Sequence, residues 1–353
     1  MEGPLLNKND PGAGITEDIF LQQVVLSAGY GSFAGMQWNA QIGRRLKLRD
    51  LHYLLTVVQA GSMAKAAAQL SVSQPVISKV IADMEHMLGV RLLDRSPRGV
   101  EPTIYGRRLL TSSYAVFDEL RQGVIEIEHL SDPAAGELSI GSNEASTLGI
   151  VPTVIETIRR QHPRFFIQVI LANTAAEQRR ELSQRRIEFA IGRVWAPATD
   201  REFETEVLFE QQLFVVAGAH NPWTQRSRVE LAELIEGPWV MPSLEGVSGQ
   251  LVAEVFRISG LEVPRSNVVT ASFQLNYRLL EDGPFLAMLP ASVVAALMKN
   301  TSLRIVPVAL PKQSSPIGIV KLRNRRLSPV AEIFIQAARA VAKSMPPPEP
   351  APP

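Results

Sequence analysis

The chain has 353 residues, 46% apolar and 20% charged, a globular balance with room for two or three domains. It has no cysteine, which excludes disulfides and thiolate metal sites, and its five scattered histidines disfavour any other metal site. The net charge is only +1, but residues 44–108 carry eleven Lys or Arg against five Asp or Glu. This distribution predicts a basic, phosphate-binding module joined to a mildly acidic remainder that does not contact phosphate.

The two ends of the chain differ from its middle. Residues 1–45 form an irregular extension in which the stretch 24–35 faintly resembles a Gly-rich nucleotide loop, but its third glycine comes one position late. We expect a disordered tail there, or a true start at Met36. Residues 345–353 form a Pro-rich tail, expected to be solvated rather than an SH3-type ligand. With no apolar run of about 20 residues and no signal-peptide pattern, a cytoplasmic protein without membrane contact is predicted.

Three short helices open the organised sequence. The first is predicted by apolar residues at helical spacing, Leu51, Leu54, Leu55 and Val58. Ser62 is placed as the N-cap of a second helix over 63–70. Ser73 is placed as the N-cap of a third helix that ends at Gly89, with Pro75 tolerated in its first turn. A helix-turn-helix follows from this order.

In such a unit the second helix of the pair lies in the DNA major groove, with its N-terminal residues at base edges. The residues predicted to lie there are Ser73, Gln74, Pro75, Ser78 and Lys79. The apolar residues expected to pack on Leu51, Leu54 and Leu70 are Val76, Ile77, Val80 and Ile81. DNA contacts and core contacts are therefore assigned to opposite sides of one helix.

A β wing is predicted after this helix. A strand-like run over 90–95 is followed by a Ser-Pro-Arg-Gly turn at 96–99 and an extended run. Arg95 and Arg98 flank the turn, where they would contact phosphates beside the minor groove. The predicted DNA-binding set is completed by Ser62 and Thr103.

A long helix is predicted over 105–130, and it makes up most of a linker segment at 105–132. Its apolar steps of three and four are typical of a coiled-coil seam, formed by Leu110, Ser113, Phe117, Leu120, Val124 and Ile127. An amphipathic helix on a monomer core is the alternative; we favour a dimer seam.

Beyond residue 136, strand and helix signals alternate, which predicts an α/β domain with largely parallel sheets. There is no P-loop, nucleophile elbow or zinc-protease motif, so we expect no enzyme and no cofactor. A carboxylate pair of Glu144 and Glu245 is the weak catalytic alternative. A purely architectural DNA-binding protein is the other alternative, and the large second part disfavours it.

The N-terminal pattern resembles the LysR-type transcriptional regulators. The residues that carry this resemblance include Leu51, Ala60, Gly61, Ser62, Ala66, Ala67, Leu70, Ser73, Gln74, Pro75, Ser78, Glu85, Leu88, Gly89, Leu93, Arg95, Thr103 and Gly106. The chain departs from the family pattern at Met84, where the family usually has Leu, and at Tyr105, where the family usually has a small residue. The similarity continues more loosely to about residue 343, through Gly136–Gly141, His162-Pro163 and the run 280–290.

The resemblance implies a multi-domain α+β chain: a winged helix-turn-helix at 46–104, the linker helix, and an effector domain at 137–344 that resembles type 2 periplasmic binding proteins. Lobe I would comprise 137–209 and 307–344, and lobe II 210–306. By family position, the effector would contact Ser142, Asn143, Ser146, Thr174, Arg193, Met241, Pro242 and Ser243. The implied partners are double-stranded promoter DNA, a second copy in a homodimer or homotetramer, RNA polymerase for an activator, and a small effector such as a carboxylate or sugar.

Overall fold

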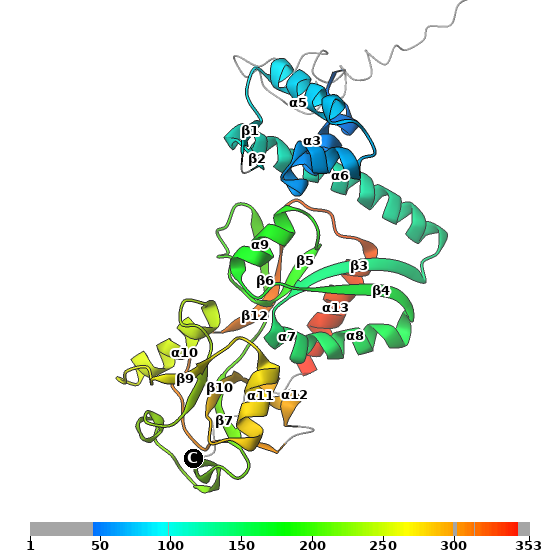
Figure 1. Ribbon diagram of the computed structural model, residues 1–353. Coiled ribbons are helices and arrows are strands. Elements are labelled where there is room, and N and C mark those ends of the chain that lie inside the picture. The colour runs from blue at the N-terminus through cyan, green and yellow to red at the C-terminus, as the bar shows by residue number, and fades with distance from the viewer. Residues whose placement is uncertain (1–44, 98, 299–301, 314, 345–353) are drawn as a thin grey trace, which may run out of the picture. The chain divides into compact units, whose positions relative to one another are not determined.

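The computed structural model describes residues 45–97, 99–298, 302–313 and 315–344, and it divides into two compact units, Met1–Ser113 and Tyr114–Pro353 (Figure 1). The predicted extension with its nucleotide-loop alternative, Met36, Arg98 and the Pro-rich tail all lie outside the described residues.

The first unit contains the predicted helices followed by a hairpin. Its elements are α3 (Leu48–Ala60), α4 (Met63–Gln69), α5 (Gln74–Leu88), β1 (Leu93–Ser96), β2 (Gly99–Pro102) and the start of α6 (Ile104–Ser131). Strands β1 and β2 are antiparallel, with Ser96 opposite Gly99, so the turn predicted at 96–99 closes a two-stranded wing. Helix α3 ends at Gly61, whose φ of 64° is a left-handed conformation that glycine adopts without strain.

The buried stripe of α5 is narrower than predicted. Ile77, Ile81 and Met84 are buried at spacings of four and three, but Val76 is 44% exposed. The prediction that Val76 packs in the core was wrong, because one residue turns a helix by about 100° and places Val76 beside the stripe rather than in it. Ser73 stands at the N-cap position of α5, and its hydroxyl makes no capping bond.

Helix α6 spans the boundary between the two units. Leu110 and Ser113 are buried within the first unit, and the Ser113 hydroxyl donates to the Leu109 carbonyl, 2.8 Å away. Leu120, Val124 and Ile127, farther along the helix, are 51–64% exposed. The predicted seam therefore has two different halves: the first is part of a core, and only the second is open.

The second unit contains two sheets. The larger, which we call lobe I, has the strand order β4-β3-β5-β12-β6. Its strands are β3 (Ala135–Ser142), β4 (Arg164–Leu171), β5 (Phe189–Arg193), β6 (Phe203–Glu210) and β12 (Pro316–Leu322). Its helices are α7 (Glu144–Leu148), α8 (Ile150–Gln161), α9 (Ala175–Ser183) and α13 (Pro329–Ser344). Helices α8 and α13 share one core with the sheet, and α9 packs in another, so helices cover both faces.

The remaining elements form lobe II. Its strands are β7 (Leu213–Gly218), β8 (Trp239–Met241), β9 (Ser266–Val269), β10 (Ala287–Pro290) and β11 (Leu303–Ile305). Its α-helices are α10 (Val247–Ile258), α11 (Phe273–Asp282) and α12 (Ala291–Leu297), beside short 3-10 turns at Pro222–Gln225 and Leu231–Leu234. Trp239 and Phe256 stack edge to face, with ring centres 5.7 Å apart, in its core.

The prediction of largely parallel sheets holds only in part. Strand β3 is parallel to β4 and β5, but β12 is antiparallel to β5 and β6, and β7 is antiparallel to β10 and β11. The chain leaves lobe I after Glu210 and returns at Pro316, so a strand that comes back from the other lobe can run against its neighbours. The two crossing segments are bonded together: Ser315 N donates to the Glu210 carboxylate, 3.0 Å away. None of the helices in the described residues is long and apolar enough to span a membrane.

Candidate nucleic-acid interface and effector site

The N-terminal edge of α5 presents polar groups to solvent. Ser73, Gln74, Pro75 and Lys79 are exposed, and Ser78 is half-buried. The same helix is fixed from behind by Ile77, Ile81 and Met84, which are at most 1% exposed. A rigid helix with an amide, two hydroxyls and an ammonium on its open edge can donate to and accept from base edges and phosphates.

Val76 is a residue that the sequence analysis missed at this edge. It is 44% exposed and lies next to Gln74 and Pro75 on the open side of the helix. An exposed methyl-bearing side chain among polar ones can contact the 5-methyl group of thymine in the major groove. The helical spacing could have indicated this exposure, because Ile77, Ile81 and Met84 alone form a complete buried stripe and leave Val76 outside it.

The wing has a basic side and an acidic side. Asp94 lies directly opposite Glu101 across the hairpin, and Arg95 lies opposite Val100. Since successive residues of a strand point to opposite faces, Arg95 is directed away from the two carboxylates. Its guanidinium is 3.4 Å from the Ser78 hydroxyl of α5, so the basic face of the wing adjoins the polar edge of that helix. Only this face suits phosphate.

Of the three remaining predicted DNA-binding residues, Thr103 has structural partners of its own. The Thr103 hydroxyl donates to the Arg91 carbonyl at 2.7 Å and accepts from Gly106 N at 3.1 Å, so Thr103 fastens the start of α6 to the segment before the wing. Ser62 is half-buried at the N-cap position of α4, without a side-chain capping bond. The predicted contact by Arg98 falls on a residue outside the described ones.

The predicted effector residues of lobe I gather at the ends of β3 and β5. The Asn143 side chain caps α7 by accepting from Ser146 N, 2.9 Å away. Ser142 is fully buried, and its hydroxyl donates to the Ile191 carbonyl at 3.0 Å. A Cβ at Gly192 would lie 3.2 Å from the Asn143 amide, so the end of β5 passes close to this cap. The start of α7 and the end of β5 therefore form one polar corner.

Arg193 brings a positive charge to this corner. Its side chain is half-buried, and burial lowers the pKa of its guanidinium while leaving the group charged. A partly desolvated guanidinium binds carboxylates and phosphates more strongly than an exposed one does.

The remaining predicted effector residues are more dispersed. Thr174 caps α9, and its hydroxyl accepts from Glu177 N at 3.1 Å in a reciprocal capping box. Met241 is buried at the end of β8, Pro242 is half-buried and Ser243 is exposed, all in lobe II. A ligand that contacted Arg193 and Ser243 together would have to span the two lobes.

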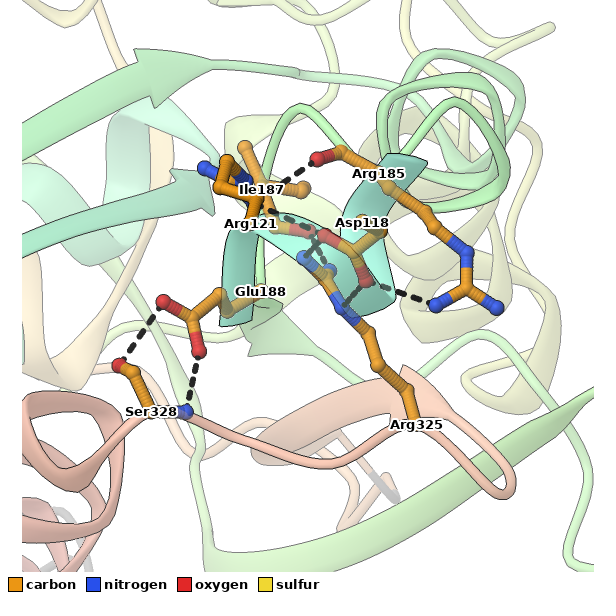
Figure 2. Close-up of polar contacts among 7 residues, drawn as sticks. All are labelled: Asp118, Arg121, Arg185, Ile187, Glu188, Arg325 and Ser328. Carbon is orange, nitrogen blue, oxygen red and sulfur yellow. Dashed lines mark hydrogen bonds and ion pairs between the residues drawn. The ribbon is translucent and has the colours of Figure 1, made fainter. Parts of the chain in front are cut away.

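A second polar cluster was not predicted at all. Asp118 on α6, Arg185 after α9 and Arg325 after β12 meet in the second unit (Figure 2). Asp118 and Arg325 are 207 positions apart, and no local motif marks either residue. Sequence reasoning had no signal with which to pair them.

A basic winged helix-turn-helix joined to a two-lobed α/β unit defines the class of DNA-binding proteins with an attached sensing domain. The sequence profile described as "Bacterial regulatory helix-turn-helix protein, lysR family" matches residues 48–107, and the "LysR substrate binding domain" matches residues 131–343. The chain therefore belongs to the LysR family of bacterial transcriptional regulators, and it is a DNA-binding regulator rather than an enzyme.

The chain is similar in sequence to known regulators and similar in fold to solved structures. The chain is 29% identical over 299 residues to the HTH-type transcriptional regulator GbpR of Azospirillum brasilense, covering 84% of this chain and 87% of that protein. It is 26% identical over 304 residues to PcaQ of Agrobacterium fabrum, covering 85% and 96%. A full-length OxyR variant from Pseudomonas aeruginosa shares the fold with a TM-score of 0.65 at 20% identity, covering 86% and 99%. The LysR family regulator CbnR shares it with a TM-score of 0.60 at 22% identity, covering 85% and 100%.

Proposed function

We propose that this regulator binds its operator through the open edge of α5 and the basic face of the wing. Gln74 and Ser78 contact base edges, Val76 contacts a thymine methyl group, and Lys79 and Arg95 neutralise phosphates. The observation that carries the proposal is the separation of α5 into a polar exposed edge and an apolar buried side. Ser73 and Pro75 shape the start of the helix at the groove.

Dimerisation through the second half of α6 would place two such helices on one operator. Leu120, Val124 and Ile127 are exposed apolar residues at steps of four and three, which suits a short coiled-coil seam. Two recognition helices on a dyad bind half-sites about one helical turn of DNA, or a multiple, apart. Val124→Asp should lower the oligomeric state in sedimentation, whereas an unchanged state would reject this seam.

Pairing of effector domains would extend the dimer to a homotetramer. Strand β4 lies at the edge of the lobe I sheet and exposes Phe166 and Leu171, which are 61% and 60% exposed. An edge strand with open apolar residues is a natural surface for a second copy of the chain.

The effector is an anionic small molecule, either a carboxylate or an acidic sugar derivative, held near Asn143 and Arg193. Asn143 lies beside the end of β5 and supplies a polar side chain, and Arg193 supplies the charge. Such a ligand controls DNA binding only by binding two arrangements of the protein with different affinity. At an activated promoter the rearranged complex would contact RNA polymerase, and the regulator would act in the cytoplasm, where the chromosome lies.

The decisive experiment selects genomic fragments bound by the purified full-length protein and maps the bound site by footprinting. At one fixed salt concentration, affinity for the selected site should exceed affinity for random duplex by about 10³ or more. A ratio near unity would instead support the architectural alternative, and no binding at low salt would reject the function.

The effector proposal has its own test. Thermal unfolding of the full-length protein is followed against a panel of carboxylates and acidic sugars, since a ligand at 100 times its Kd stabilises by about 2.7 kcal/mol. The stabilisation should disappear in Arg193→Gln and persist in Arg164→Gln, which changes an exposed arginine at the start of β4. Equal loss in both variants would reject the assignment of Arg193.

A further inference from the structure

Helix α6 is held against the effector domain by a buried carboxylate. Asp118 is 2% exposed, and the Arg325 side chain that faces it is 1% exposed. Arg325 binds the carboxylate with two parallel bonds, from Nε at 2.9 Å and Nη2 at 2.8 Å (Figure 2). Arg185 adds a third bond at 2.7 Å, and Arg121 adds one from the same helix at 2.9 Å. We call these four residues the clasp.

The clasp is a fixed ionic contact rather than a surface pair. Burial alone would raise the pKa of Asp118, but attraction to Arg325 and hydrogen bonds from Arg185, Arg121 and Arg325 outweigh it and hold the pKa below its usual 3.8. The carboxylate therefore stays charged near neutral pH, and removing it would leave the buried Arg325 guanidinium without the carboxylate that it binds.

The turn that carries Arg325 is also bonded to the segment that precedes β5 in the lobe I sheet. Arg325 Nη1 also donates to the Ile187 carbonyl, just before β5. The neighbouring Glu188 accepts from Ser328 N at 2.8 Å and from the Ser328 hydroxyl at 2.9 Å. The turn after β12 is thus bonded at two points, Ile187 and Glu188, to the segment just before β5 (Figure 2).

The same two strands run from the clasp to the polar corner that we assign to the effector. Strand β5 begins beside Glu188 and ends at Arg193, and β12 pairs with it along its length, with Ile317 opposite Arg193 and Lys321 opposite Phe189. At about 3.3 Å per residue this path is about 13 Å long. Strand β12 is also the segment by which the chain returns from lobe II, so a shift between the lobes acts directly on it.

Several buried polar atoms of α6 and of the segment after α9 have no hydrogen-bond partner in the described part of the protein. Gln122, one helical turn after Asp118, is 2% exposed, and neither of its amide atoms has a hydrogen-bond partner. The side-chain Oε1 of Gln184, next to Arg185, and His129 Nδ1 are likewise buried and unbonded. These atoms therefore add no protein hydrogen bond to those of the clasp.

From this arrangement we infer that Asp118 and Arg325 are coupling residues, the joint through which the state of the effector domain reaches helix α6 and so the DNA-binding unit. The inference rests on the proposed function, because it presumes that lobe movement controls DNA binding. A second ion pair, between Arg326 and Glu126 at 2.9 Å, joins the same turn to α6, but its side chains are 67% and 30% exposed and it contributes less than the buried clasp.

Hydrogen exchange of the full-length protein, with and without its selected operator, tests the joint. Asp118→Asn should speed exchange of the α6 amides over 114–131 by about tenfold or more, and leave β3 and β5 protected. It should also change the length or spacing of the operator footprint while the protein still binds. Glu119→Gln is the matched control: Glu119 is the next carboxylate along the same helix, but it is exposed and is not part of the clasp, so exchange and footprint should match the wild type.

Unchanged α6 exchange in Asp118→Asn, or a wild-type footprint from it, overturns the inference. If that variant unfolds the whole domain, the double variant D118L/R325M decides, since apolar residues of similar size leave no unpaired charge in the pair. A folded double variant with a released α6 and an altered footprint supports the joint, and one with a wild-type footprint overturns it. If the wild type itself fails to bind DNA, the proposed function fails, while the exchange data still test whether Asp118 holds α6 against the effector domain.

Discussion

The edge of α5 and the clasp use polar side chains in opposite ways. At α5, Gln74 and Lys79 are exposed above an apolar anchor, whereas at the clasp Asp118 and Arg325 are buried and bonded to each other. Groups left open to solvent can bind another molecule, and groups satisfied internally can only hold parts of one molecule together. The exposed polar residues are therefore assigned to DNA binding and the buried ones to coupling within the protein.

The largest effect is expected at the clasp. Asp118→Ala removes the carboxylate that pairs with the buried Arg325 and should lower the free energy of unfolding of the effector domain by about 3–5 kcal/mol, measured by denaturant titration. Asp132→Ala removes a carboxylate just after α6 whose ion pair with Arg164 is 58% and 45% exposed, so solvent screens it and the loss of stability should be much smaller. Similar losses at both positions would contradict the distinction between the two kinds of charge.

The clasp also predicts a dependence on pH. Because its partners hold the pKa of Asp118 below 3.8, the stability it contributes is complete above that value and is lost as pH falls through the lower, folded-state pKa. The difference in unfolding free energy between wild type and Asp118→Asn should be constant near neutrality and shrink below pH 3.8. A difference that already shrinks near neutrality would contradict the direction of the shift.

At α5, Gln74→Ala should cost about 1–3 kcal/mol at the selected operator and little on random duplex, because only the operator offers the matching base edge. Fluorescence anisotropy at one salt concentration measures both affinities. Equal losses on the two DNAs would show that Gln74 does not select bases.

Val76→Ala should weaken operator binding by about 1 kcal/mol, the scale of one buried methyl group. Operators in which single thymines are replaced by deoxyuridine provide the test. One replacement should weaken the wild type by a similar amount but have no further effect on the variant. Additive losses at every thymine would exclude this contact.

The smallest effect on DNA affinity is expected for a substitution in the wing. Arg95→Ala should weaken binding to all sequences alike and reduce the slope of log affinity against log salt by about one per arginine lost. Glu101→Gln, on the acidic face of the same hairpin, is the matched control and should not reduce the slope. A reduction in both variants would show that the wing is not oriented as the register indicates.

The local features of this protein follow from its sequence. Helical spacing predicted the helices of the first unit, the Ser-Pro-Arg-Gly turn predicted the hairpin at 96–99, and the composition of 44–108 predicted a basic module. Such features depend on residues a few positions apart, so side-chain periodicity and turn chemistry suffice. The same reasoning was wrong at the edge of the buried stripe of α5, where Val76 was predicted to be buried and is exposed beside the buried Ile77.

Tertiary structure alone decided the rest. The direction of β12, the exposure of only the second half of the α6 seam and the pairing of Asp118 with Arg325 all join segments that are distant in the chain. A buried carboxylate is stable only where the fold brings compensating charges to it, and no short-range pattern specifies which arginine that will be. The sequence by itself determined the elements and their chemistry, and long-range packing determined which of those groups meet.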